Sequence, residues 1–282
     1  MKFLKKYPRL YNFLKDFKSI LREALAPSKA AKFKGWYGMT LYTDPPWIST
    51  DLKQDSLEHQ FKLVDIFTKN SVEDGSMKLI QFDHYNLDTI KILSELTWRH
   101  YIVFWSSYYA ARNTKSNIKG MVEVGVADGL TLNYAFHALE CYGFEFHGYL
   151  YDTWDEVVLE NPSTKGTETQ YDYLDINTTK SNLKKFEEKL TFKQGFIPDT
   201  FTGDQEPETI SWLHIDLNSS PPTLDTLNYY WDRLESGGVV LFDDYAQPAY
   251  IDTKRAVDVW LLDKTDGVIL QIPSSQAIIF KV

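Results

Sequence analysis

From residue 119 onward, short apolar runs alternate with amphipathic segments, and this alternation limits the possible folds more than any other feature of the chain. The short runs are rich in Val, Ile, Phe and Tyr, which is typical of buried strands. The longer segments repeat apolar residues at helical spacing. Strands that alternate with helices indicate a parallel sheet covered on both faces. We therefore predict an α/β fold with a doubly wound, mostly parallel, seven-stranded sheet.

The limits of these elements follow from the pattern. The predicted strands cover residues 121–126, 146–151, 190–193, 210–215, 239–242, 268–271 and 277–281. The predicted helices between them cover residues 130–141, 178–188, 223–234 and 253–262. Residues 57–67 and 87–112 are also predicted to be helical, and the aromatic run 98–109 is predicted to face the core. Residues 153–173 form either a mobile cover over a site or an ordinary surface loop.

The first 34 residues differ in charge from the rest of the chain. They hold ten Lys and Arg against two acids, whereas the whole chain has a net charge of −9. Their apolar residues recur every three or four positions, which predicts a basic amphipathic helix over 1–34. This helix either makes peripheral contact with an anionic membrane or docks on the protein itself. We expect a mostly helical and irregular cap or substrate region at 35–118, and the main domain at 119–282.

Composition excludes several classes of protein. The acidic net charge argues against a general nucleic-acid binder. The single cysteine, Cys141, rules out a disulfide framework and indicates a cytoplasmic protein. We find neither an apolar run long enough to span a membrane nor a signal peptide. The aromatic-rich segments outside the sheet are consistent with a homo-oligomer.

The loop after the first predicted strand has the features of a nucleotide-binding turn. It starts at Glu123 and contains Gly125 and Gly129, which let the backbone turn tightly and approach a ligand. The next strand ends at Asp152, whose carboxylate can accept the hydrogens of both ribose hydroxyls. Together these residues predict a ligand that contains adenosine. They do not separate S-adenosylmethionine from a nicotinamide dinucleotide.

Three further strand ends carry candidate site residues. The third predicted strand is followed by Gly195 and Phe196, an aromatic residue that can stack on adenine. Asp216 follows the fourth strand, and Asp243 and Asp244 follow the fifth. Three neighbouring acids repel one another unless a cation holds them, and an oxygen-only ligand set suits Mg²⁺. Alternatively, the acids after the fifth strand only cap that strand and its turn.

These motifs resemble the macrocin O-methyltransferase family. The resemblance covers about residues 119–282 and rests on VEVGV (122–126), YDTW (151–154), QGFIPDT (194–200), HID (214–216), GGVVLFDDY (237–245) and KRAVD (254–258). It implies the Rossmann-like fold of class I S-adenosylmethionine-dependent methyltransferases, and an enzyme that methylates sugar hydroxyls of natural products. It also implies that Gly125 and Gly129 shape the S-adenosylmethionine site and that Asp152 holds the ribose. The implied Mg²⁺ ligands are Asp216, Asp243 and Asp244.

One position departs from the family pattern. The family usually has a second acid two residues after the first metal ligand, as a candidate base, and this chain has Asn218 there. An amide cannot take up a proton near neutral pH, so another base acts or the metal contributes more. His214 and Tyr245 are nearby candidates. Alternatively, Asn218 orients the acceptor, or the chain has lost catalysis.

Two other functions compete with a methyltransferase. A non-catalytic binding protein of the same fold would explain Asn218. A short-chain dehydrogenase would explain the spacing of Tyr250 and Lys254, but not the missing third glycine or the three acids. The sequence therefore favours a Mg²⁺-dependent O-methyltransferase that acts on a hydroxyl of a small molecule.

Overall fold

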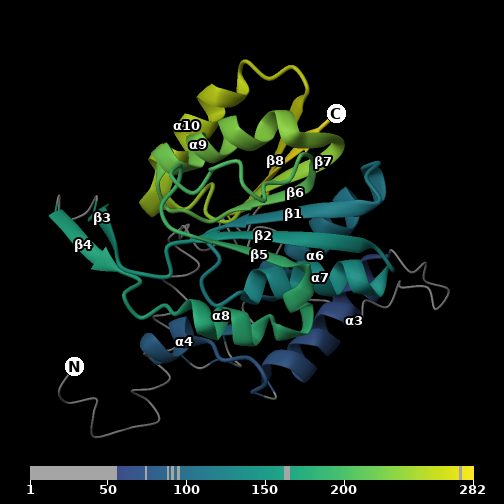
Figure 1. Ribbon diagram of the computed structural model, residues 1–282, viewed down its shortest axis with the longest axis vertical. Coiled ribbons are helices and arrows are strands. Elements are labelled where there is room, and N and C mark those ends of the chain that lie inside the picture. The colour runs from purple at the N-terminus through teal and green to yellow at the C-terminus, as the bar shows by residue number, and fades with distance from the viewer. Residues whose placement is uncertain are drawn as a thin grey trace, which may run out of the picture. The chain divides into compact units, whose positions relative to one another are not determined.

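Seven strands form one twisted sheet in the order β5-β2-β1-β6-β7-β9-β8 (Figure 1). Their bounds are β1 Ile118–Val124, β2 Glu145–Asp152, β5 Leu190–Gln194, β6 Ile210–Ile215, β7 Leu234–Phe242, β8 Gly267–Gln271 and β9 Ala277–Lys281. Pairing is parallel from β5 to β7, and β9 runs antiparallel to both of its neighbours. The predicted seven-stranded, mostly parallel sheet is confirmed.

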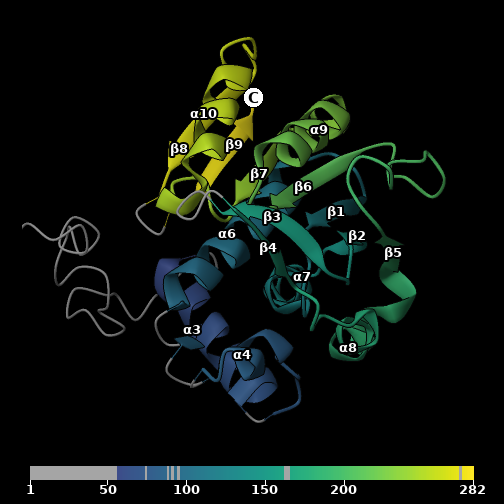
Figure 2. The ribbon, with the colours of Figure 1, turned by 90° about the vertical axis from the view of Figure 1, so that its left-hand side faces the viewer.

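Helices cover both faces of this sheet (Figures 1 and 2). The face with α6 and α7 also carries α3 and α8, and the opposite face carries α9 and α10. The helix bounds are α3 Leu57–Thr68, α4 Ile80–His84, α6 Thr97–Asn113, α7 Leu130–Cys141, α8 Ile176–Asn182, α9 Ser220–Tyr230 and α10 Ile251–Leu261. A π-helix at Lys69–Glu73 and short 3-10 helices at Lys184–Lys189, Trp231–Arg233 and Pro248–Tyr250 complete the helical elements.

Alternate residues of each central strand point to opposite layers of the core. In β1, Met121 packs in the core on the side of α6 and α7, whereas Val122 and Val124 pack on the side of α9 and α10. Successive side chains of a strand face opposite ways, so a strand between two helical layers must be apolar on both faces. This requirement explains why the central strands appear in the sequence as nearly continuous apolar runs.

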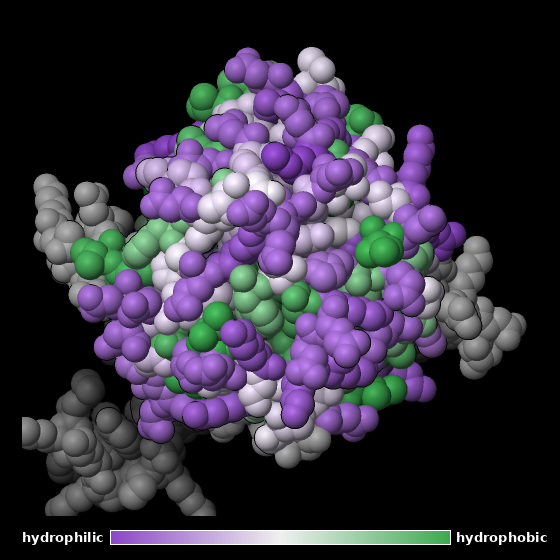
Figure 3. Space-filling view, in the orientation of Figure 1, coloured by the Kyte–Doolittle hydropathy of each residue, from purple (hydrophilic) through white to green (hydrophobic). Residues whose placement is uncertain are grey.

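The structure describes residues 56–73, 75–87, 89, 92–93, 96–161, 166–272 and 275–282 of the chain. They belong to one compact unit, Thr50–Val282. The predicted basic helix over 1–34 lies outside the described residues, as does nearly all of the irregular segment after it. Among the described helices, we find none with the length and apolar character needed to cross a membrane. On the face in Figure 3, polar residues predominate and apolar ones are scattered in small groups.

Three parts of the fold differ from the sequence prediction. The helix predicted over 87–112 is not continuous, because α6 begins at Thr97 and Leu96 before it lies in a turn. Residues 153–173 contain an antiparallel hairpin of β3 (Val157–Asn161) and β4 (Gly166–Gln170), which projects beyond the large sheet in Figure 1. The helix predicted over 178–188 is divided into α8 and a 3-10 helix. The aromatic run 98–109 does face the core, because most of the buried residues of α6 belong to it.

Candidate active site

A pocket of about 590 Å³ opens at the carboxyl ends of the parallel strands. This is where open α/β sheets bind ligands, next to the point at which the strand order reverses. The residues that line it come from the ends of β1, β2, β5, β6 and β7, and from α4, α6 and the hairpin. Its volume lies within the usual range for small-molecule sites. The sheet therefore brings residues from five strand ends to one cavity.

Gly125 lies where the backbone after β1 passes close to the backbone after β6. Its φ is +85°, and a Cβ built on it would lie 2.0 Å from the backbone oxygen of Asp216. Only glycine combines this conformation with so close an approach. Gly129 also has a positive φ, but it caps the start of α7 and is not among the residues that line the pocket. Gly125 thus lies at the pocket, and Gly129 shapes the loop from outside it.

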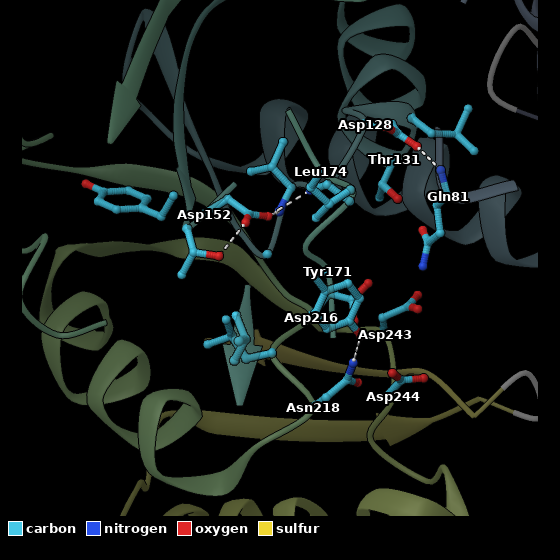
Figure 4. A pocket seen from close by; sticks show the side chains of 18 of the residues that line it. Gln81, Asp128, Thr131, Asp152, Tyr171, Leu174, Asp216, Asn218, Asp243 and Asp244 are labelled. Carbon is cyan, nitrogen blue, oxygen red and sulfur yellow. Dashed lines mark hydrogen bonds between the residues drawn. The ribbon is translucent and has the colours of Figure 1, made fainter. Parts of the chain in front are cut away.

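The carboxylate of Asp152 fixes the loop between β1 and α7. Its Oδ2 accepts hydrogen bonds from the backbone N–H of Val126 at 2.7 Å and of Ala127 at 2.8 Å (Figure 4). Its Oδ1 accepts one from Trp154 N–H at 2.9 Å and a longer one from the Thr153 hydroxyl at 3.4 Å. The Thr153 hydroxyl also donates to the Asp155 carbonyl at the shorter distance of 3.1 Å, so a ligand hydroxyl can take its place on Oδ1. Trp154 itself is buried, and its indole N–H donates to the Ala127 carbonyl and the Thr179 hydroxyl.

Two polar side chains attach the segment before α4 to the same loop. Asp128 accepts a hydrogen bond from Gln81 N–H at 3.0 Å. Asn182 pairs with both the N–H and the carbonyl of Lys78, at 2.9 and 2.8 Å. Burial raises the pKa of Asp128. That α4 reaches the site could not be predicted from the sequence, because these contacts join residues about 50 to 100 positions apart.

Asp128→Ala is expected to loosen this wall of the pocket. The substitution leaves the N–H of Gln81 without its partner, which should lower the free energy of unfolding by about 1–2 kcal/mol. Leu79 and Phe82, which line the pocket beside it, should then be held less firmly and bind ligands less well. Chemical denaturation and ligand titration measure both effects. Asp83→Ala, at an exposed position of α4, is the control and should change neither.

Three carboxylates meet at the other end of the pocket. Asp216 follows β6 and Asp243 and Asp244 follow β7, and each offers an oxygen within 4.8 Å of the others (Figure 4). Burial, followed by repulsion from Asp243 and Asp244, raises the pKa of Asp216 well above its usual value. Burial and Asp243 also raise the pKa of Asp244 to about 6. The cluster therefore repels itself and would be stabilised by a cation.

Arg99, in the first turn of α6, supplies one positive charge to this cluster. Its Nε donates to Asp243 Oδ1 at 2.7 Å, its Nη2 lies 3.6 Å from Asp216 Oδ2, and its Nη1 donates to Thr131 at 3.2 Å. Burial opposes ionisation of Asp243, but Arg99, together with His214 and Gln276, outweighs burial and lowers the pKa of that carboxyl. Arg99 was not predicted as a site residue. The only local signal was a charged residue at the start of a core-facing aromatic run.

Two predicted site residues lie inside the sheet and not at its edge. Glu123 and His214 are paired across β1 and β6, with 2.8 Å between Oε1 and Nδ1. Their side chains are 1% and 0% exposed, and neither residue lines the pocket. Glu123 was predicted to contact the cofactor, but in the structure it joins β1 to β6 through His214 and does not reach the pocket. His214 is too deep to contact an acceptor, which corrects its prediction as a catalytic residue.

Tyr245 also lies away from the pocket. Its ring is buried against the α10 side of the sheet, its hydroxyl donates to Asp258, and it accepts from Lys254 Nζ at 2.9 Å. Its predicted catalytic role has no support in this geometry. Lys254 is thus engaged with Tyr245 and Asp258, while Tyr250 ends the 3-10 helix before α10. Tyr250 and Lys254 are therefore four residues apart only because they lie at the start of α10, and they do not form a dehydrogenase site.

Asn218 does line the pocket, together with Tyr171. The Nδ2 of Asn218 donates to the Tyr171 hydroxyl at 2.8 Å, and both residues have a positive φ, 52° and 68° (Figure 4). The Oδ1 of Asn218 is buried and has no hydrogen-bond partner among the described residues. Gly195 and the exposed ring of Phe196 also line the pocket, on the side of Asp152.

Comparison with known proteins identifies the domain that holds this pocket. Residues 122–245 match a family described as a methyltransferase domain. The chain is a methyltransferase. The matched segment starts in β1, ends at Tyr245 and contains the glycine loop, Asp152 and all three acids of the cluster.

Solved structures show the same fold. The O-methyltransferase NovP superposes with a TM-score of 0.54 at 17% identity, over 65% of this chain and 79% of NovP. CalS11, a calicheamicin methyltransferase, gives 0.50 at 16% identity, over 83% of this chain and 98% of CalS11. A search of curated proteins finds no match. The class I methyltransferase fold is thus confirmed, and the narrower resemblance to macrocin O-methyltransferases stays a prediction.

Proposed function

We propose that this methyltransferase uses S-adenosylmethionine and Mg²⁺ to methylate a hydroxyl group of a small molecule. One observation carries the proposal. A single pocket holds, at one end, a glycine turn and an acid suited to a nucleoside and, at the other, three converging carboxylates. A methyl donor and a cation-bound acceptor need to lie side by side in this way.

The end of the pocket near β1, β2 and β5 suits the cofactor. Asp152 would accept a ribose hydroxyl through Oδ1, Gly125 and Gly195 would present backbone without a side chain to the ligand, and Phe196 would pack on the adenine. S-adenosylmethionine supplies a sulfonium methyl group that is already a reactive electrophile. The protein then mainly has to align the acceptor oxygen with the methyl–sulfur bond and exclude water.

The acidic end suits a hard cation. Asp216, Asp243 and Asp244 offer only oxygen ligands. Burial and the neighbouring carboxylates raise the pKa of Asp216 and of Asp244, although Arg99 helps to lower that of Asp243, so a further cation would stabilise the cluster. Bound Mg²⁺ would lower the pKa of a hydroxyl that coordinates it. In this proposal the three carboxylates hold the cation and so place the acceptor oxygen beside the cofactor end.

Asn218 and Tyr171 would orient the acceptor. The unpartnered Oδ1 of Asn218 can accept a hydrogen from an acceptor hydroxyl, while Tyr171 fixes the amide through its other end. Val157 from the hairpin and Tyr85 after α4 line the pocket and would limit the access of water. The resemblance to macrocin O-methyltransferases favours a sugar hydroxyl as the acceptor.

A non-catalytic cofactor-binding protein is the second candidate. It is favoured by Asn218, where the resembling family has a base, and by Arg99, which already holds two of the three carboxylates. Methyl transfer to any hydroxyl in an acceptor panel would exclude it. Tight cofactor binding with no transfer to a broad panel of phenols, sugars and alcohols would favour it.

Asp152→Ala provides the first test of the cofactor site. The change removes an acceptor for ribose and releases the loop N–H groups of Val126 and Ala127, so S-adenosylhomocysteine should bind about 10- to 100-fold more weakly. Calorimetric titration with and without Mg²⁺ measures this. Asp263→Ala, at an exposed position after α10, is the charge-matched control. Wild-type protein that does not bind S-adenosylhomocysteine would overturn the proposed cofactor.

A further inference from the structure

Asp243 is held from one side by two other side chains. Its Oδ1 accepts both the Arg99 Nε hydrogen bond at 2.7 Å and one from Gln276 Nε2 at 3.2 Å. Within the described residues, its Oδ2 and both oxygens of Asp244 accept no hydrogen bond. Polar groups behind a ligand commonly orient it toward a bound cation. The second oxygen of Asp243 is thus left available to the cluster.

Neither of these two side chains belongs to the matched domain. Arg99 lies in α6, before residue 122, and Gln276 lies directly before β9, after residue 245. Both are brought to Asp243 by packing, because α6 covers the sheet at β6 and β7 and β9 pairs with β7. The Gln276 side chain is fully buried, and that of Arg99 is 19% exposed. Their positions are therefore well defined.

Arg99 also changes the charge of the cluster. The three ionised carboxylates carry −3, and the guanidinium brings the total to −2, which is balanced by one divalent cation. Because Arg99 and Asp243 are largely buried, water screens this charge only weakly. Arg99 contacts Asp243 closely and Asp216 at 3.6 Å, and it forms no ion pair with Asp244 among the described residues. Arg99 therefore reduces the negative charge of the cluster but leaves Asp244 available to a cation.

We propose that Arg99 makes this cation site selective for divalent over trivalent ions, and that Gln276 helps it to position Asp243. The inference rests on the proposed function, since it assumes a cation at the three carboxylates. Without the guanidinium the cluster would carry −3, and a trivalent ion would gain more than a divalent one. With the guanidinium in place, each added unit of cation charge is repelled by one fixed positive charge.

The test compares Mn²⁺ with Tb³⁺ in calorimetric titrations that need no turnover. The guanidinium of Arg99 repels a trivalent ion more strongly than a divalent ion, because the trivalent ion carries one more positive charge. Arg99→Gln removes this repulsion and should raise the ratio of Tb³⁺ to Mn²⁺ affinity about 10- to 100-fold. Arg99→Lys keeps the charge, so its ratio should stay near the wild-type value while both affinities fall. Gln276→Leu should behave like Arg99→Lys, because it alters the position of Asp243 but no charge.

The outcomes separate this inference from the proposed function. An unchanged ratio in Arg99→Gln, or an equal rise in Arg99→Lys, would overturn the role of Arg99 while the cation site stood. If Arg99→Gln does not fold, Arg99→Gln combined with Asp244→Asn restores a charge of −2 and should restore the wild-type ratio. Wild-type protein that binds neither ion would overturn the cation site and this inference together, and S-adenosylhomocysteine titration would report separately on the cofactor.

Discussion

Gly125→Ala is expected to abolish S-adenosylhomocysteine binding and to destabilise the protein by more than about 4 kcal/mol. The added Cβ would lie 2.0 Å from the backbone oxygen of Asp216, and no side-chain rotation relieves a clash with backbone. That backbone is itself fixed, because Asp216 N–H donates to the Val124 carbonyl at 2.9 Å. Relief requires that the ends of β1 and β6 move apart, which would deform both ends of the pocket.

Gly143→Ala is the matched control for this prediction. Gly143 also has a positive φ, +71°, but a Cβ there would meet no atom within 4 Å. Its substitution carries only the conformational penalty of about 1–2 kcal/mol. Chemical denaturation of both variants, with calorimetric titration, separates that penalty from the clash. If Gly125→Ala matched Gly143→Ala in stability and bound the ligand normally, the proposed close approach would be incorrect.

The sheet could be predicted because its central strands are buried on both faces. Such strands are mostly apolar on both faces, and β6 at Ile210–Ile215 coincides with the predicted run for this reason. The hairpin of β3 and β4 has no such requirement. It forms a separate two-stranded sheet away from the core, so its sequence shows neither a long apolar run nor a clear alternation.

The candidate site was predictable only for residues at strand ends. Gly125, Asp216 and Asp243 directly follow parallel strands that pair in register, so the sheet itself brings them together. Glu123 and His214 each lie two residues before a site residue, Gly125 and Asp216, and are buried inside the sheet. Two residues along a strand place a side chain about 6–7 Å further from the edge of the sheet, and sequence patterns do not fix strand ends to that accuracy.

Contacts between distant segments could not be predicted in any case. Arg99 and Asp243 are 144 positions apart, and their ion pair depends on how α6 packs across the sheet. Nothing near Arg99 in the sequence repeats with a period that would reveal this partner. The same holds for Gln276. The residues that adjust the acidic cluster are thus the ones that only the structure shows.

Asp216→Asn is expected to reduce divalent-dependent methyl transfer to background. The amide keeps the size of the side chain but removes one of three carboxylates from the proposed Mg²⁺ site. A metal ion contributes several kcal/mol to such reactions, so the rate should fall at least about 100-fold. Initial rates with Mg²⁺ and with a chelator measure the loss. Asp263→Asn, at an exposed position, is the control, and undiminished wild-type activity in chelator would contradict the metal's role.

The same substitution should stabilise the metal-free protein. Burial and the neighbouring acids disfavour the charged form of Asp216 in the folded state, since its pKa is raised well above the usual value. A neutral amide avoids that repulsion, so the free energy of unfolding without metal should rise by about 1 kcal/mol at neutral pH. S-adenosylhomocysteine should still bind, because Asp152 lies at the other end of the pocket. An inactive but more stable variant would show that the acidic cluster is retained for a cation and not for the fold.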